Sequence, residues 1–206
     1  MTSQAGAAGI ARFARAGGPP QRLPRWLPRR LPQQLPQWLP ATFAVATVLA
    51  QIAYPLTSGD ARDVLTVLTV LLFAAASVTA AWQAGGRRFA GRLLLVTVGV
   101  GFVAEAVGVA TGVPFGSYSY AGSLGPRLLG VPVIIPLAWT MMAYPALVVA
   151  RRCAAGAAAR IAVGALALAS WDVFLDPQMV HAGHWHFNSG NGPTMTGIPL
   201  VNFAGW

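Results

Sequence analysis

Five apolar runs in this chain each approach the length that an α-helix needs to cross a bilayer, roughly 20 residues. Arginine, glycine or proline bounds each run. Within a bilayer core only helices and closed barrels satisfy every backbone hydrogen bond, so the runs predict helices. The sequence therefore predicts an all-α, polytopic transmembrane helical bundle of about five complete spans, with a partial sixth that begins at Gly197. The runs lie at about 41–56, 64–84, 93–113, 131–150 and 161–175.

The composition also places the chain in a membrane. Hydrophobic residues make up 55% of the sequence and charged residues only 9%, with a mean hydropathy of +0.58. The net charge is +9, and every basic residue is an arginine in a short connection or in the N-terminal tail. This placement favours anionic lipid over nucleic acid as the partner. The single cysteine, Cys153, excludes an internal disulfide.

The arginines predict an orientation. Twelve of them precede the first run or lie in every second connection after it, whereas the alternate connections hold only Arg62 and Arg127. By the positive-inside rule the N-terminus is cytoplasmic, and we expect an integral protein of a bacterial plasma membrane. The twelve are Arg12, Arg15, Arg22, Arg25, Arg29, Arg30, Arg87, Arg88, Arg92, Arg151, Arg152 and Arg160.

The first forty residues form a different kind of segment. From Leu23 the pair Leu-Pro recurs every four residues, a pattern that excludes an α-helix and favours extended chain. We therefore predict a disordered, Arg/Pro-rich cytoplasmic tail at 1–40 and a transmembrane helical domain at 41–206. An alternative is that the arginines of this tail, with Trp26 and Trp38, rest on anionic headgroups.

Three of the five acidic residues lie inside or at the mouth of apolar runs: Glu105, Asp172 and Asp176. An ionised carboxylate in hydrocarbon is costly, so such a residue indicates a functional site. Asp172 and Asp176 are four apart and share one helix face, and Pro177 is expected to end that helix. In the predicted orientation all three acids approach the outer half of the bilayer. The alternatives are that Glu105 only bonds a neighbouring helix and that Asp176 only finishes a helix in interfacial water.

Two patterned stretches are expected beside these acids. Residues 113–136 are rich in glycine and proline and carry several aromatic residues, and residues 171–206 hold all three histidines and further tryptophans. Irregular backbone at membrane depth is tolerated only where it is buried in protein or lines a cavity. We therefore expect both stretches at one site, although an interfacial aromatic belt is the alternative for the tyrosines and tryptophans.

Several ordered blocks within residues 93–206 resemble a known family, the membrane carotenoid-biosynthesis hydratases of the bisanhydrobacterioruberin and gamma-carotene hydratase type. Members of this family continue through further spans, so the resemblance implies a chain truncated at its C-terminus. The blocks are Glu105 and Gly108, Phe115 to Tyr120, Leu124-Gly125-Pro126, Gly130-Val131-Pro132, Ile135 to Trp139, Trp171-Asp172, Asp176 to Val180, Gly197-Ile198-Pro199, Asn202 and Gly205-Trp206.

The resemblance implies addition of water to a terminal C=C bond of an acyclic carotenoid end group, giving a tertiary alcohol without a cofactor. The expected substrate is a long hydrophobic polyene, and other membrane proteins of the carotenoid pathway are candidate partners. Glu105 is the candidate acid, because a carboxylic acid in an apolar site can stay protonated near neutrality. Asp172 or Asp176 is the candidate that orients water.

Aromatic rings and polar groups near the acids are candidates for binding the substrate and stabilising a carbocation. Asn202 has a plain alternative as a polar residue in helix packing. The six candidate substrate-binding residues are Phe115, Tyr118, Tyr120, Trp139, Trp171 and Asn202.

Other functions remain open at this stage. His181, His184 and His186 offer nitrogen ligands for a metal, but their spacing matches no recognised site, so we predict no metal and interpret them as a solvated or interfacial loop. A small transporter also places acids within spans. A non-catalytic carotenoid-binding or assembly subunit is a further alternative. A carotene cyclase shares the first protonation, and the sequence does not separate capture of the cation by water from capture by an alkene.

Overall fold

The computed structural model describes residues 35–206. Almost all of the predicted tail, including the first three of its five Leu-Pro pairs, lies outside the described residues, so the tail and the domain boundary at 40 stay predictions. The last pair, Leu39-Pro40, does not exclude a helix as predicted, because it lies in the first turn of one, where proline is tolerated. The described part is mostly helical, which confirms the predicted class to this extent. Its helices are α1 (Leu39–Ala53), extended by the short η1 (Tyr54–Leu56), α2 (Asp60–Thr111), α3 (Ile135–Cys153), α4 (Ala157–His181) and α5 (Leu200–Gly205).

Within the described residues, three helices are long and apolar enough to cross a membrane. They are Leu39–Leu56, α2 and α4, and each contains predicted apolar runs. The fourth run falls in α3, which is not among these three. The structure thus supports membrane association without confirming five spans.

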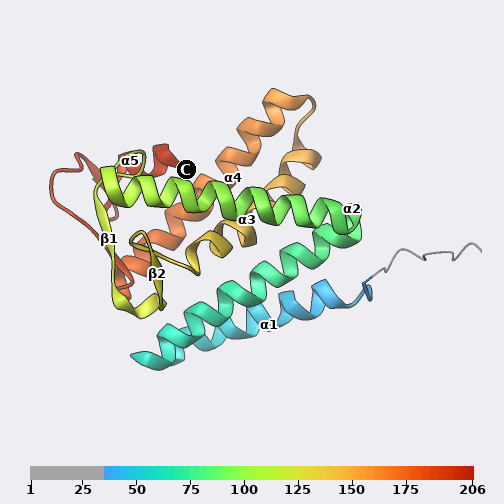
Figure 1. The fold of residues 1–206 in the computed structure, drawn as a ribbon, viewed down its shortest axis with the longest axis horizontal. Coiled ribbons are helices and arrows are strands. Elements are labelled where there is room, and N and C mark those ends of the chain that lie inside the picture. Colours follow the sequence, from blue (N-terminus) through green and yellow to red (C-terminus); the bar gives the residue numbers. More distant parts are fainter. Residues whose placement is uncertain (1–34) are drawn as a thin grey trace, which may run out of the picture. The chain divides into compact units, whose positions relative to one another are not determined.

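Helix α2 is a single stretch of 52 residues that folds back on itself. Straight, it would reach about 78 Å, more than twice the thickness of a hydrocarbon core. Its bend is at Gly86, whose φ of 78° and ψ of 173° are essentially restricted to glycine. Figure 1 shows the chain reversing direction there. The second and third predicted runs therefore lie on two arms of α2, a first arm (60–85) and a second arm (87–111), with no separate loop between them.

The bend gathers the arginine-rich end of the bundle. Gln83 donates a hydrogen bond to the carbonyl of Pro36, so α1 begins beside the bend. The guanidinium of Arg151, at the end of α3, lies 5.6 Å from the ring centroid of Phe89, just past the bend. Within residues 35–206, the arginines just past the bend and those at the end of α3 therefore lie at one end of the bundle, as the sequence predicts.

The opposite end contains short strands that the all-α prediction lacks. They form three two-stranded antiparallel ladders, β1 with β4, β2 with β3 and β5 with β6. In the first ladder Tyr118 lies opposite Phe187 and Tyr120 opposite Trp185, so the two patterned stretches meet as expected. The strands are β1 (Tyr118–Tyr120), β2 (Arg127–Leu128), β3 (Val131–Pro132), β4 (Trp185–Phe187), β5 (Thr194–Met195) and β6 (Ile198–Pro199), with the short helix η2 (Gly122–Leu124) after β1.

A cluster of large buried apolar side chains lies at this same end, whereas the buried apolar residues along the helices are mostly alanines. Many large apolar side chains on the helices are exposed, as expected for surfaces that face lipid. The core cluster instead draws most of its members from the connection between α2 and α3. Its fully buried members are Phe115, Tyr118, Tyr120, Leu124, Val131, Ile134 and Ile135.

We predict that Gly86→Ala destabilises the fold by about 1 to 3 kcal/mol, because a Cβ forces strain at this φ and ψ. No atom lies within 4 Å of that Cβ position, so the backbone alone sets the effect. Gly91→Ala is the matched control, since Gly91 is helical and its Cβ position is also open. Thermal unfolding in detergent measures both. Equal unfolding temperatures for Gly86→Ala and wild type would contradict the role of the bend.

Candidate active site

Glu105 lies on the second arm of α2, one and a half turns before the helix ends, and only 4% of it is exposed. Three side chains donate hydrogen bonds to its carboxyl group. The hydroxyls of Tyr118 and Tyr120 both bond Oε2, at 2.6 and 2.7 Å. The indole nitrogen of Trp139 on α3 bonds Oε1 at 3.0 Å. Every contact of Glu105 is therefore with a donor, the arrangement that suits an ionised carboxylate.

Strand β1 explains how two tyrosines reach one oxygen atom. Residues two apart on a strand point to the same face, so Tyr118 and Tyr120 lie side by side with ring centroids 5.6 Å apart. Burial, and then the neighbouring Glu105, raise the pKa of both hydroxyls. Both tyrosines therefore remain neutral hydrogen-bond donors across the physiological pH range.

Two glycines of the second arm make room for these donors. A Cβ at Gly101 would lie 2.6 Å from the ring of Trp139, and a Cβ at Gly108 would lie 2.7 Å from the hydroxyl of Tyr118. Gly101 and Gly108 flank Glu105 at spacings of four and three, a sequence pattern that predicts a smooth strip for contact with another helix. The structure fills that strip with aromatic side chains that reach the carboxylate.

The other two acids form a pair on α4. Asp172 is fully buried and Asp176 is 4% exposed. One amide nitrogen, Nδ2 of Asn202 on α5, donates to both, at 2.7 Å to Asp172 and 2.6 Å to Asp176. The second oxygen of Asp172, Oδ1, is buried without a hydrogen-bond partner. Pro177 does not end the helix as predicted, since α4 continues to His181 and keeps both acids on one turn of regular helix.

A cavity of about 60 Å³ joins Glu105 to Asp176. Within the described residues no arginine or histidine lies at ion-pair distance from Glu105, Asp172 or Asp176. The cavity is thus acidic, aromatic and without a counter-charge. It is lined by Glu105, Phe115, Tyr118, Tyr120, Ile135, Ala138, Trp139, Leu175, Asp176, Trp185, Phe187, Asn202 and Trp206.

Most residues singled out from the sequence meet in this cavity. Two do not reach its wall. Asp172 joins it only through Asn202, and Trp171 packs edge-on against Phe73 of the first arm, with ring centroids 6.4 Å apart.

Sequence reasoning missed three aromatic residues of the wall. Trp185 and Phe187 come from β4, and their alternate spacing is the strand signal that could have found them. Trp206 stacks on Trp139 with ring centroids 4.7 Å apart and an interplanar angle of 17°. Only the folded chain brings these two tryptophans together.

One of the three histidines differs from the prediction of a solvated loop. His184 is fully buried, whereas His181 and His186 are exposed. Within residues 35–206 no group of three or more His, Cys, Asp or Glu side chains is arranged to hold a metal ion.

Comparison with known proteins identifies the family. The model of a family described as carotenoid biosynthesis protein matches residues 64–206, which is more than half of the chain. The chain belongs to this family. The resemblance expected from the sequence blocks is thereby confirmed, and the matched region contains every residue of the cavity wall.

Bisanhydrobacterioruberin hydratase from Haloarcula japonica is 33% identical to this chain over 124 residues. The aligned region is 58% of this chain and 41% of that protein, so the chain aligns with less than half of this relative's length. No solved structure matches the chain.

Proposed function

We propose that this member of the carotenoid biosynthesis family adds water to a terminal C=C bond of an acyclic carotenoid end group, giving a tertiary alcohol. The observation that carries the proposal is a cavity lined both by buried carboxyl groups of two kinds and by aromatic rings. The name of the Haloarcula japonica relative, a hydratase, supports the same reaction. None of the steps described below needs a redox cofactor.

We assign the proton to the aspartate pair. Asp172 and Asp176 share a single donor, and two carboxylates this close cannot both ionise without a counter-charge. One proton held between them is therefore available to the cavity through Asp176, which lines its wall. This assignment moves the role of acid from Glu105, the candidate expected from the sequence, to the aspartate pair.

Glu105 serves better as the fixed negative charge. Its oxygens already accept three hydrogen bonds, so a proton on this carboxyl group would displace one of them. A preorganised carboxylate stabilises a positive charge that develops in a dry cavity. The rings of Trp139, Trp185 and Phe115 also line the cavity and add π-electron density to its wall.

The reaction then balances in two steps. The aspartate pair gives its proton to the CH carbon of the terminal double bond, which leaves a cation on the tertiary carbon. A water oxygen bonds to that carbon and returns one proton to the pair, so the alcohol forms and the acid is restored. The pair acts first as acid and then as base.

The size of the cavity limits what enters it. A volume of about 60 Å³ corresponds to about two water molecules, so only the end of a polyene fits there. The remainder of the substrate stays in lipid, beside exposed apolar side chains of α4 such as Phe174. We propose lateral entry from the outer leaflet.

We further propose that all five long helical segments cross the membrane, counting the two arms of α2 separately. The arginine-rich end would face the cytoplasm, and the cavity would lie towards the outside. The partial sixth span would begin with α5.

Expression in cells that accumulate an acyclic carotene tests the reaction. We expect a pigment heavier by one water, detected by chromatography and mass spectrometry. Asp176→Asn should lower its formation by about 10² to 10⁴-fold, the usual contribution of a general acid. A pigment of unchanged mass but new retention would indicate cyclisation, and unaltered pigment with full-length protein in the membrane would contradict catalysis by this chain.

Removal of a donor to Glu105 tests its charge state. We expect Tyr118→Phe or Tyr120→Phe to lower product formation by about 10- to 100-fold, because each removes a hydrogen bond to an ionised group. If Glu105 were the proton donor, loss of a donor would favour its protonated form and leave product formation unchanged or higher. Tyr144→Phe is the control, since the Tyr144 hydroxyl bonds the Ala80 carbonyl, remote from the cavity.

The orientation is testable through the single cysteine. Cys153 is exposed at the arginine-rich end. In intact spheroplasts we expect a membrane-impermeant maleimide to leave Cys153 unlabelled. The same reagent should label Ser189→Cys, placed in the exposed connection after β4 in a Cys153→Ser background. The reverse labelling pattern would invert the proposed topology.

A further inference from the structure

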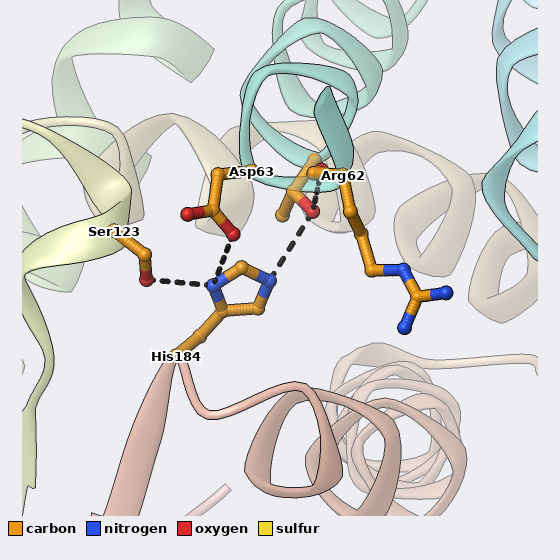
Figure 2. Close-up of polar contacts among 5 residues, drawn as sticks. Arg62, Asp63, Ser123 and His184 are labelled. Carbon is orange, nitrogen blue, oxygen red and sulfur yellow. Dashed lines mark hydrogen bonds and ion pairs between the residues drawn. The ribbon is translucent and has the colours of Figure 1, made fainter. Parts of the chain in front are cut away.

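A second buried polar cluster lies outside the cavity and centres on His184. This residue is fully buried and immediately precedes β4. Its Nδ1 lies 2.8 Å from Oγ of Ser123 in η2 and 3.8 Å from Oδ1 of Asp63 on the first arm of α2. Its Nε2 lies 3.3 Å from Oγ1 of Thr66, also on the first arm. Figure 2 shows the imidazole ring of His184 between Ser123 and the first arm of α2, which carries both Asp63 and Arg62.

The hydrogen bonds define the state of the ring. Thr66 donates its hydroxyl proton to the carbonyl of Arg62 at 2.9 Å, so Thr66 can only accept from His184. Nε2 of His184 therefore carries a proton. In the neutral ring Nδ1 is then an acceptor, and it receives the hydroxyl proton of Ser123. Neutral His184 is thus fully satisfied by one threonine and one serine.

The backbone of His184 connects this cluster to the site. Its carbonyl accepts a hydrogen bond from Ala121 N at 2.8 Å, directly after β1. The next residue, Trp185, lies opposite Tyr120 in the β1–β4 ladder and lines the cavity. Tyr120 in turn donates to Glu105. A short covalent and hydrogen-bonded path therefore runs from His184 to the carboxylate.

We propose that neutral His184 is a positioning residue, which ties the first arm of α2 to the β1–β4 ladder and so holds Trp185 and Tyr120 against Glu105. A catalytic effect of positioning Trp185 and Tyr120 rests on the proposed function, whereas the tether, the link between the first arm and the ladder, does not. The polar partners of the His184 ring, Thr66, Ser123 and Asp63, do not line the cavity, so His184 acts through β4.

Charge makes this tether sensitive to pH. Burial lowers the pKa of His184 below its ordinary value of 6.5, Asp63 opposes that shift, and Arg62 adds to it. Between the folded-state pKa and pH 6.5, His184 is therefore more protonated in the unfolded chain than in the folded chain. The stabilisation by neutral His184 is complete above pH 6.5 and declines as the pH falls towards the folded-state pKa. A protonated Nδ1 would exchange the Ser123 hydroxyl for the carboxylate of Asp63.

Thermal unfolding of the full chain in detergent, from about pH 7.5 down to about pH 5.5, tests the pH dependence. We expect the difference in unfolding temperature between wild type and His184→Gln to shrink as the pH falls. His181→Gln is the matched control, since His181 is exposed, and its difference should stay constant. A constant difference for His184→Gln as well would overturn the proposal.

Asp63→Asn provides a second variant if His184→Gln fails to fold. Loss of the negative charge of Asp63 makes protonation of His184 less favourable. Acidification should therefore destabilise Asp63→Asn more than wild type. Identical pH profiles for the two chains would exclude a titrating role for His184.

Hydrogen exchange measured by mass spectrometry tests the positioning role without reference to catalysis. At about pH 7.5 we expect amides in segments 118–121 and 184–187 of Thr66→Val to exchange about three- to tenfold faster than in wild type, because the substitution removes the hydrogen bond between His184 and the first arm. Unchanged exchange there would overturn the tether. A chain with the expected exchange but no hydrated pigment would refute the proposed function and leave the tether standing.

Discussion

Three buried acidic side chains, for which residues 35–206 supply no basic partner, are the constraint around which this fold is organised. Burial of an unpaired carboxylate is costly, so donors must be supplied from elsewhere in the chain. For Glu105 these donors are two tyrosines from β1 and a tryptophan from α3. For the aspartates the donor is one amide from α5. The irregular end of the molecule therefore supplies most of these donors, from β1 and α5, to carboxyl groups on α2 and α4.

This requirement explains features that membrane insertion alone does not. The helices need only apolar surfaces and satisfied backbones to enter a bilayer. The short β1–β4 ladder, in contrast, aligns Tyr118 and Tyr120 on one face, and the glycines at 101 and 108 remove the Cβ atoms that would block Trp139 and Tyr118. His184 connects the β1–β4 ladder to the first arm of α2. Its ring hydrogen-bonds Thr66, and its backbone carbonyl, directly before β4, accepts a hydrogen bond from Ala121.

The sequence predicted the helices and most of the cavity from local signals. Apolar runs located the helical segments, and three acids in those runs marked the site. Residue type and spacing were less informative where long-range contacts decide. Trp171 and Trp139 look alike in the sequence, yet only Trp139 lines the cavity. The burial of His184 was likewise missed, because its partners Thr66 and Ser123 lie far away in the chain. The continuation of α4 past Pro177 was also missed.

Composition and periodicity by themselves indicated a mostly helical, membrane-associated protein with carboxyl groups near one end. These properties follow from free energies of transfer, which each segment carries independently of the others. Tertiary structure decided which chemistry each carboxyl group can support. Glu105 is surrounded by donors and the aspartates share only one, and that difference arises from the packing of α3, α5 and β1 against two separate helices. Hydrogen bonds between distant segments leave no local pattern, so the assignment of acid and carboxylate required the folded chain.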